Sequence, residues 1–196
     1  MARPNVEAVR KEQILRSALQ QLSERGVVGL RVSDVANGAG VSGGIVHYYF
    51  DTKLDLIRAA FEENASQSLE RRAAIFADES ADVRTTLYDL IDTYLPADET
   101  TRESWRVWIE WWAAAQRDEA LADVHNRAYE VWAQRMQAVF DRVDGADPET
   151  SRTNAHTLMA LLDGLTIQAL MGSSVMSIDH MRQLCRHTVD LLLGDC

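Results

Sequence analysis

The chain has 196 residues, of which 46% are hydrophobic and 26% are charged, and its formal net charge is −10. These values exclude a disordered chain, and no stretch approaches the ~20 uncharged apolar residues that a membrane-spanning helix needs. Two cysteines are too few for a disulfide framework or a zinc site, and an acidic average argues against a surface coated in basic charge for bulk nucleic-acid binding.

The charge is uneven along the chain. Residues 1–60 hold eight Lys/Arg and six Asp/Glu, a balance of +2, whereas residues 61–196 carry −12. A mildly basic head followed by an acidic body indicates two regions with separate roles, which we predict to be domains at 1–55 and 56–196. The first residues contain no apolar signal core, so we expect a cytoplasmic protein.

Helices are expected throughout, because only three prolines interrupt the chain and no run alternates between apolar and polar residues. The predicted fold is all-α, with a three-helix head and a C-terminal helical bundle, about nine helices in total. In chain order the predicted helices cover about residues 6–25, 32–38, 43–49, 52–77, 81–95, 101–117, 119–143, 149–172 and 178–193.

Glycines and capping residues set the boundaries in the head. Gly26 fits a left-handed cap after the first helix, and Gly40 permits a sharp turn between the second and the third. Ser42 is a good N-cap, and Asp51 or Thr52 caps the fourth helix. Two short helices joined by a glycine turn and braced by a third form a helix-turn-helix, whose second short helix enters the DNA major groove.

An ordered run of residues surrounds this turn: Val35-Ala36, then Ala39-Gly40-Val41-Ser42-Gly43-Gly44-Ile45-Val46-His47-Tyr48-Tyr49-Phe50, then Lys53-Leu54. The run resembles the DNA-binding head of TetR-family transcriptional regulators. The resemblance implies that Ser42 caps the recognition helix and that Lys53 meets a phosphate at the start of the fourth helix. It also implies DNA contacts by Gly43, Ile45, His47 and Tyr48.

One position departs from the family pattern. Arg31 stands where the family usually has Thr or Ser as the cap of the second helix, so either the cap shifts to Ser33 or Arg31 reaches a phosphate. Because Gly43 and Gly44 leave little side chain at the front of the recognition helix, base reading is expected from His47, Ser33, Arg31 and DNA shape. These glycines weaken a short helix by up to ~1 kcal/mol each, so we expect it to be partly mobile without DNA.

Four of the five tryptophans lie close together in the body. Trp105, Trp108 and Trp112 share one helical face, and Trp111 is offset from it. The stretch from Trp105 to Trp132, with Leu121, His125 and Tyr129, resembles the C-terminal domain of BetI-type regulators. The segment Leu161-Leu162-Asp163-Gly164-Leu165 with Gln168 and Leu170 continues that resemblance.

The resemblance implies a pocket in the body that senses a small molecule and moves the fourth helix and the DNA heads apart. In the choline-responsive branch the ligand is a quaternary amine, and aromatic faces attract such cations by ~0.5–2 kcal/mol each. An acidic group such as Glu110 would add to the attraction. The alternative is that the tryptophans fill the core or an interface between helices. The predicted ligand-binding residues are Trp105, Trp108, Trp112 and Trp132.

The last two predicted helices carry more apolar residues than the packing of a single body needs. The excess predicts that they pair across a two-fold axis as a four-helix bundle, which presents two heads to the half-sites of a palindrome. The predicted dimer-interface residues are Leu158, Leu162, Leu165, Met181 and Leu184.

The leading hypothesis is a homodimeric, ligand-responsive transcriptional regulator, most often a repressor in this family, released from a palindromic operator by a small molecule. Two alternatives remain: an architectural DNA-binding protein without a ligand, and a helical enzyme that uses the body pocket. No catalytic residue and no cofactor are predicted, because the body shows no nucleophile–base pairing or phosphate loop. No metal is predicted either, since His180 and His187 lie seven residues apart without the spacing of a zinc pair.

Overall fold

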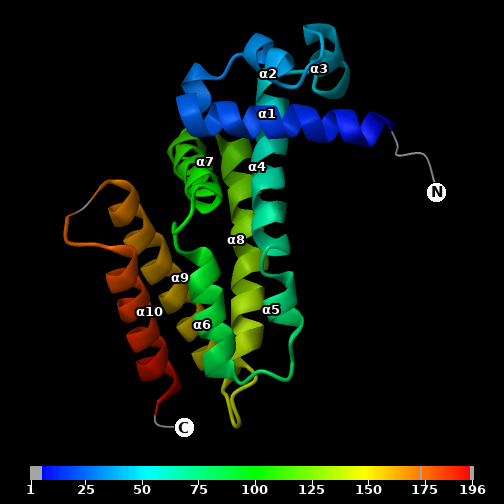
Figure 1. Ribbon diagram of the computed structural model, residues 1–196. Helices are drawn as coiled ribbons and strands as arrows, with labels where there is room; N and C mark the ends of the chain where they lie inside the picture. The colour runs from blue at the N-terminus through cyan, green and yellow to red at the C-terminus, as the bar shows by residue number, and fades with distance from the viewer. Residues whose placement is uncertain (1–5, 173, 195–196) are drawn as a thin grey trace. The chain divides into compact units, whose positions relative to one another are not determined.

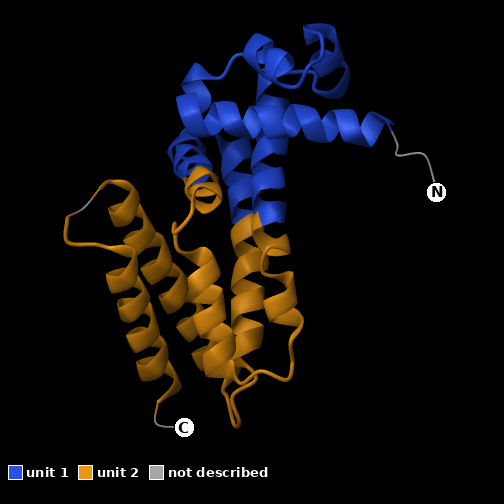
Figure 2. Ribbon diagram, in the orientation of Figure 1, with its two compact units in different colours: residues 1–67, 106–126 blue, residues 68–105, 127–196 orange. Residues whose placement is uncertain are grey.

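Ten helices form the described part of the chain, residues 6–172 and 174–194 of a computed structural model (Figure 1). These residues contain no strand, which confirms the all-α prediction. The chain divides into two compact units (Figure 2): residues 1–67 with 106–126, and residues 68–105 with 127–196. The predicted domains, 1–55 and 56–196, concern roles and stay a prediction.

Unit 1 contains α1 (Val6–Gly29), α2 (Val32–Gly38) and α3 (Gly43–Tyr49). It also takes the greater part of α4 (Lys53–Glu70), the second half of α7 (Glu99–Ala115) and the start of α8 (Glu119–Phe140). Its core is built from helical stripes that are at most 1% exposed: Ile14, Ala18, Leu22, Val35, Val46, Leu56, Phe61 and Trp111.

Unit 2 contains α5 (Ala73–Ala77), α6 (Val83–Tyr94), α9 (Pro148–Leu170) and α10 (Ile178–Leu193), with the remaining parts of α4, α7 and α8. α10 packs against α6 and α9 through Met181, Cys185 and Val189, which lie four residues apart on one face and are fully buried. Pro148 occupies the first turn of α9 as predicted. Within the described residues, no helix combines the length and the apolar character needed to cross a membrane.

The turn chemistry of the head agrees with the prediction except at Gly26. Gly40 has a φ of 67°, which residues other than glycine rarely adopt. Gly26 has φ 68° and ψ 179° and lies within α1, where it breaks the helix, but α1 continues to Gly29 and does not end at Gly26 as predicted. The hydroxyl of Ser42 accepts a hydrogen bond from the amide of Ile45, which confirms Ser42 as the N-cap of α3. Of the two candidates for the cap of α4, Thr52 is the one that caps the helix: its hydroxyl accepts a hydrogen bond from the amide of Asp55 at 3.1 Å. The Asp55 carboxylate in turn accepts a hydrogen bond from the amide of Thr52.

The single helix predicted over residues 52–77 is wrong, because α4 ends at Glu70 and α5 begins at Ala73. At the break, the amide of Arg72 bonds the carbonyl of Leu69, three residues back, and the Arg72 side chain takes the carbonyl of Ser68. These two bonds satisfy carbonyl groups in the last turn of α4, so the helix ends there without a glycine or a proline. This division accounts for ten helices in place of the predicted nine.

Candidate functional site

A tight turn joins the two short helices of unit 1. Around Gly40 there is open space where a Cβ would lie, so the left-handed backbone, and not crowding, requires glycine there. Val46, on α3, is 1% exposed and anchors that helix in the core. The rest of α3 therefore has a face left open to solvent, with its N-terminus capped by Ser42.

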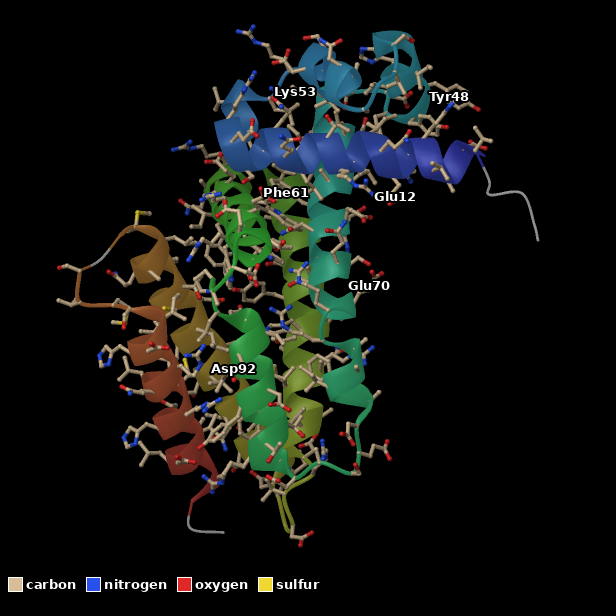
Figure 3. The ribbon with its side chains drawn as sticks, in the orientation of Figure 1. Glu12, Tyr48, Lys53, Phe61, Glu70 and Asp92 are labelled. Carbon is tan, nitrogen blue, oxygen red and sulfur yellow. The ribbon has the colours of Figure 1, made fainter. Side chains whose placement is uncertain are left out.

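The predicted DNA-binding residues lie at the surface of this unit. Tyr48 is 75% exposed, and its ring packs edge-on against Tyr49 with 5.2 Å between centroids. Tyr49 donates its hydroxyl proton to the carbonyl of Glu7 at 3.2 Å, which ties the end of α3 to the start of α1. Figure 3 shows Tyr48 and Lys53 in the part of the unit that α1, α2 and α3 form. Ile45 is half-buried and the others are exposed: Arg31, Ser33, Ser42, Gly43, His47, Tyr48 and Lys53. Their contact with DNA stays a prediction.

Of the two alternatives for the start of α2, the structure excludes a shift of the N-cap to Ser33. Arg31 is the N-cap residue, and its side chain makes no capping bond. The hydroxyl of Ser33 is directed to the carboxylate of Asp34 at 3.5 Å, so the cap does not shift to Ser33. Asp34 is in turn paired with Arg25 at 2.6 Å. The Arg31 side chain is exposed, and its contact with a phosphate, the second alternative, stays a prediction.

The carboxylate of Glu110, in α7, contacts the break in α1 at Gly26. The amide of Val27 donates to Glu110 at 2.9 Å, and a Cβ added to Gly26 would lie 2.3 Å from the Oε2 atom of Glu110. In this contact Glu110 holds the backbone of α1, and the part we expected it to take in a cation site stays a prediction. Glycine is required at position 26 both by its φ of 68° and by this close approach.

The aromatic residues of unit 1 form a stacked cluster. Trp111 stacks on Phe61 with 4.4 Å between centroids and on Trp108 with 5.0 Å, both at an interplanar angle of 8°. Trp111 is fully buried and its indole donates to the carbonyl of Leu121 at 3.0 Å, so it is a core residue. Trp108 and Trp112 are half-buried, and their rings touch at 6.4 Å between centroids.

A second aromatic cluster lies in unit 2 around Tyr94. Trp105 meets the Tyr94 ring edge-on at 4.9 Å, and Trp132 stacks with it at 5.7 Å. The Trp105 indole donates to the Tyr94 carbonyl at 2.9 Å. Phe76 closes the cluster against Trp132 at 5.6 Å. The four predicted ligand-binding tryptophans thus divide between the units: Trp105 and Trp132 meet at Tyr94, and Trp108 and Trp112 belong to the cluster of unit 1.

A carboxylate lies at the hydroxyl of Tyr94. Asp163, in α9, accepts hydrogen bonds from Tyr94 at 2.5 Å and from Tyr129. Burial, and then the Asp163 charge, raise the pKa of both tyrosines above the ordinary value, so both hydroxyls stay protonated and donate. Tyr129 also lines a surface hollow of about 450 Å³ between α8 and α9. An anion and several aromatic faces are therefore gathered in one place, which is the combination that favours an organic cation.

The predicted ligand-binding residues did not include the other members of this cluster: Arg72, Phe76, Tyr94, Tyr129 and Asp163. Arg72 is 2% exposed, and its guanidinium lies over the rings of Tyr94 and Trp132. A carboxylate between leucines in an otherwise apolar stretch of α9 was the signal that could have identified Asp163. No sequence signal connects it with Tyr94, which lies 69 residues earlier.

The predicted dimer-interface residues are placed mainly inside the chain. Leu158, Leu162 and Met181 are at most 1% exposed, so a second copy is not needed to bury them. Leu165 is 9% exposed and Leu184 is half-buried. Their part in a dimer stays a prediction, and the exposed faces of α9 and α10 carry other residues: Thr157, Ala160, Gly164 and Leu191.

Two protein families match different parts of the chain. Residues 83–194 match the family described as BetI-type transcriptional repressor, C-terminal, and residues 14–60 match the tetR family of bacterial regulatory proteins. The chain is similar to the HTH-type transcriptional regulator BetI of Stenotrophomonas maltophilia, with 28% identity over 193 residues, 98% of this chain and 97% of that one. BetI of Proteus mirabilis is 23% identical over 201 residues, covering 100% and 98% of the two chains.

Two solved structures are similar over nearly the whole chain. One, described as a transcriptional regulator from Saccharomonospora viridis in complex with choline, has a TM-score of 0.81 and 30% identity and covers 94% of this chain and 96% of its own. Another, described as a TetR-family regulator from Rhodococcus sp., has a TM-score of 0.83 and 25% identity and covers 95% and 100%.

Proposed function

Because the chain belongs to the BetI-type branch of the TetR family of transcriptional repressors, we propose that it is a homodimeric repressor that leaves a palindromic operator when a small organic cation binds the aromatic residues of its body. The relatives are transcriptional regulators and not enzymes, so the helical-enzyme alternative is set aside. The protein would act on DNA in the cytoplasm, with no cofactor.

Binding of DNA would rest on few contacts. The capped N-terminus of α3 supplies backbone amides, and exposed His47, Tyr48 and Lys53 supply side chains on or next to the same helix. Arg31 would add a phosphate contact from the start of α2. A helix with two glycines at its front reads bases through few side chains, so DNA shape would contribute to the choice of site.

The observation that carries the effector proposal is the carboxylate of Asp163 held by two tyrosine hydroxyls beside the rings of Tyr94, Trp105 and Trp132. Choline is the molecule bound in the structure from S. viridis, which is 30% identical to this chain. A quaternary ammonium cannot donate hydrogen bonds, so aromatic faces and one nearby negative charge are the groups that would recognise it. Trp108 and Trp112 belong to the separate aromatic cluster of unit 1, and their part in ligand binding stays a prediction.

Dimerisation is proposed through α9 and α10. Three small exposed residues of α9, Thr157, Ala160 and Gly164, would let a partner helix approach closely. Leu191 of α10 is 68% exposed and offers apolar area. Leu165 and Leu184 would border this surface. A two-fold dimer places two recognition helices on the two halves of a palindrome.

The head is tested by fluorescence anisotropy on a labelled duplex of the DNA upstream of the protein's own gene. The His47→Ala and Lys53→Ala variants are expected to bind the duplex more weakly than the wild type, whereas Arg117→Ala, which removes an exposed cation from the turn after α7, keeps wild-type affinity. Unchanged binding by both head variants would contradict the proposal. Binding that no organic cation relieves would favour an architectural protein instead.

The effector site is tested by calorimetric titration of choline. The Asp163→Asn variant, which keeps an acceptor for the tyrosines but loses the charge, is expected to bind choline about tenfold more weakly, equivalent to ~1.4 kcal/mol. Asp141→Asn removes an exposed carboxylate of the same unit and serves as the control. Equal affinity in the wild type and Asp163→Asn would remove this carboxylate from the effector site.

A further inference from the structure

One buried cation already occupies the aromatic faces of unit 2. The guanidinium carbon of Arg72 lies 5.1 Å from the ring centroid of Tyr94 and 5.2 Å from that of Trp132. Both distances are within the ~6 Å range of a cation–π interaction. The side chain is 2% exposed, so it is inside the cluster and not at its rim. Arg72 therefore holds a position in which an organic cation would contact these same two rings.

Neutral groups alone hold this guanidinium. It donates to the carbonyl and the hydroxyl of Ser68 and to the carbonyl of Thr93, and among the described residues it makes no ion pair with a carboxylate. Its Nε atom is buried without a hydrogen-bond partner. Burial lowers the pKa of Arg72 to about 10, which reports the loss of hydration of the charged form. A buried cation that lacks an ionic partner regains hydration when it is released to water.

The bonds of Arg72 join two helix ends. Ser68 lies in the last turn of α4, where carbonyl groups have no partner within the helix, and Thr93 lies in the last turn of α6. One side chain therefore caps α4 and ties it to α6. Loss of the guanidinium from the rings would remove both connections at once. The other end of α4 begins at Lys53, directly after the recognition helix in the chain.

We propose that Arg72 is an internal competitor of the effector: its guanidinium fills the Tyr94–Trp132 face in the free protein, and an organic cation that takes this face displaces it and frees the end of α4. The inference rests on the proposed function, because it states how the same site is switched. The exchange replaces one positive charge by another beside the Tyr94 hydroxyl that donates to Asp163, so the local charge balance is kept. A neutral ligand would have no such advantage.

The probe is tetramethylammonium chloride, titrated against NaCl of equal ionic strength and followed by tryptophan fluorescence of the full-length protein. Arg72→Ala empties the ring face and is expected to bind the probe about tenfold more tightly than the wild type. Arg71→Ala is the matched control, because Arg71 donates to Ser104 at 3.2 Å and lies over no ring in the described residues. It should bind as the wild type does. An affinity that is unchanged or lower in Arg72→Ala would overturn the proposal.

A second measurement uses the wild type and does not depend on how Arg72→Ala folds. The ¹⁵Nε signal of Arg72, identified by its loss in Arg72→Lys, should move towards the position of a solvent-exposed arginine as tetramethylammonium saturates the protein. A signal that does not move while the probe binds would refute displacement.

Failure of the inference and failure of the proposed function are distinguishable. Binding by Arg72→Ala without binding by the wild type would support the competitor and count against such cations as effectors of the native protein. Binding by neither overturns the inference, and operator binding still tests the repressor.

Discussion

Substitution of Gly26 by alanine tests the contact between α7 and the break in α1. Gly26 has φ 68° and ψ 179°, a conformation that is essentially reserved for glycine and costs another residue ~1–3 kcal/mol. The added Cβ would also lie 2.3 Å from Oε2 and 2.7 Å from Cδ of Glu110, so the carboxylate must leave. The Glu110 carboxylate then loses the hydrogen bond from the Val27 amide. A hydrogen bond to a charged acceptor is worth ~1.5–3 kcal/mol. The expected loss of unfolding free energy is about 3 kcal/mol or more.

A double-mutant cycle separates the two contributions. In a Glu110→Ala background the carboxylate is already absent, so Gly26→Ala should cost only the backbone strain, ~1–3 kcal/mol. Urea unfolding of the wild type, both single variants and the double variant gives the four free energies. The coupling between the two positions is expected to equal the lost hydrogen bond, ~1.5–3 kcal/mol. Equal costs of Gly26→Ala in both backgrounds would refute the role assigned to Glu110.

Three further predictions concern single positions. Gly44→Ala should stabilise α3 by up to ~1 kcal/mol, because alanine favours a helix over glycine and no atom lies within 3.4 Å of the added Cβ. Amide hydrogen exchange of residues 43–48 in the free protein should then slow. Firm protection of these amides already in the wild type would contradict this. Lys53→Ala should reduce the slope of log affinity against log salt by about one, and an unchanged slope would remove Lys53 from the phosphate contacts. Burial raises the pKa of the Cys185 thiol to about 11 from 9.0. In a Cys196→Ser variant at pH 8, the thiolate fraction of Cys185 should therefore be about a hundredfold lower in the folded protein than in the unfolded chain, and its rate of labelling by a thiol reagent should fall by the same factor. Equal labelling rates in the folded and unfolded protein would show that Cys185 is not buried.

Local chemistry was sufficient to predict the head. Gly40 permits a left-handed turn and Ser42 offers a capping hydroxyl, and the structure begins α3 at the residue after that cap. The net charge of the whole chain was a poor guide to DNA binding, since the head carries +2 and the remainder −12. A few amides and side chains at the end of one helix need no basic coat.

The break between α4 and α5 was not predictable in the same way. No glycine or proline marks it, and the side chain of Arg72 ends the helix by bonding Ser68 four residues back and Thr93 in another helix. The cluster around Tyr94 is of the same kind. Helical spacing placed Trp105 on a face, but the neighbours of Tyr94 come from α7, α8 and α9, and only tertiary packing brings them together.

Recognition of a cation by this repressor is tested most directly by an anisotropy titration that compares release of the operator duplex by choline with release by its neutral isostere, 3,3-dimethylbutan-1-ol. The two molecules have nearly the same shape, so only the cation distinguishes them. Recognition by aromatic faces and Asp163 predicts that choline releases the duplex at a concentration at least about tenfold lower. Release by both at the same concentration, or by neither, would contradict a cation-responsive repressor.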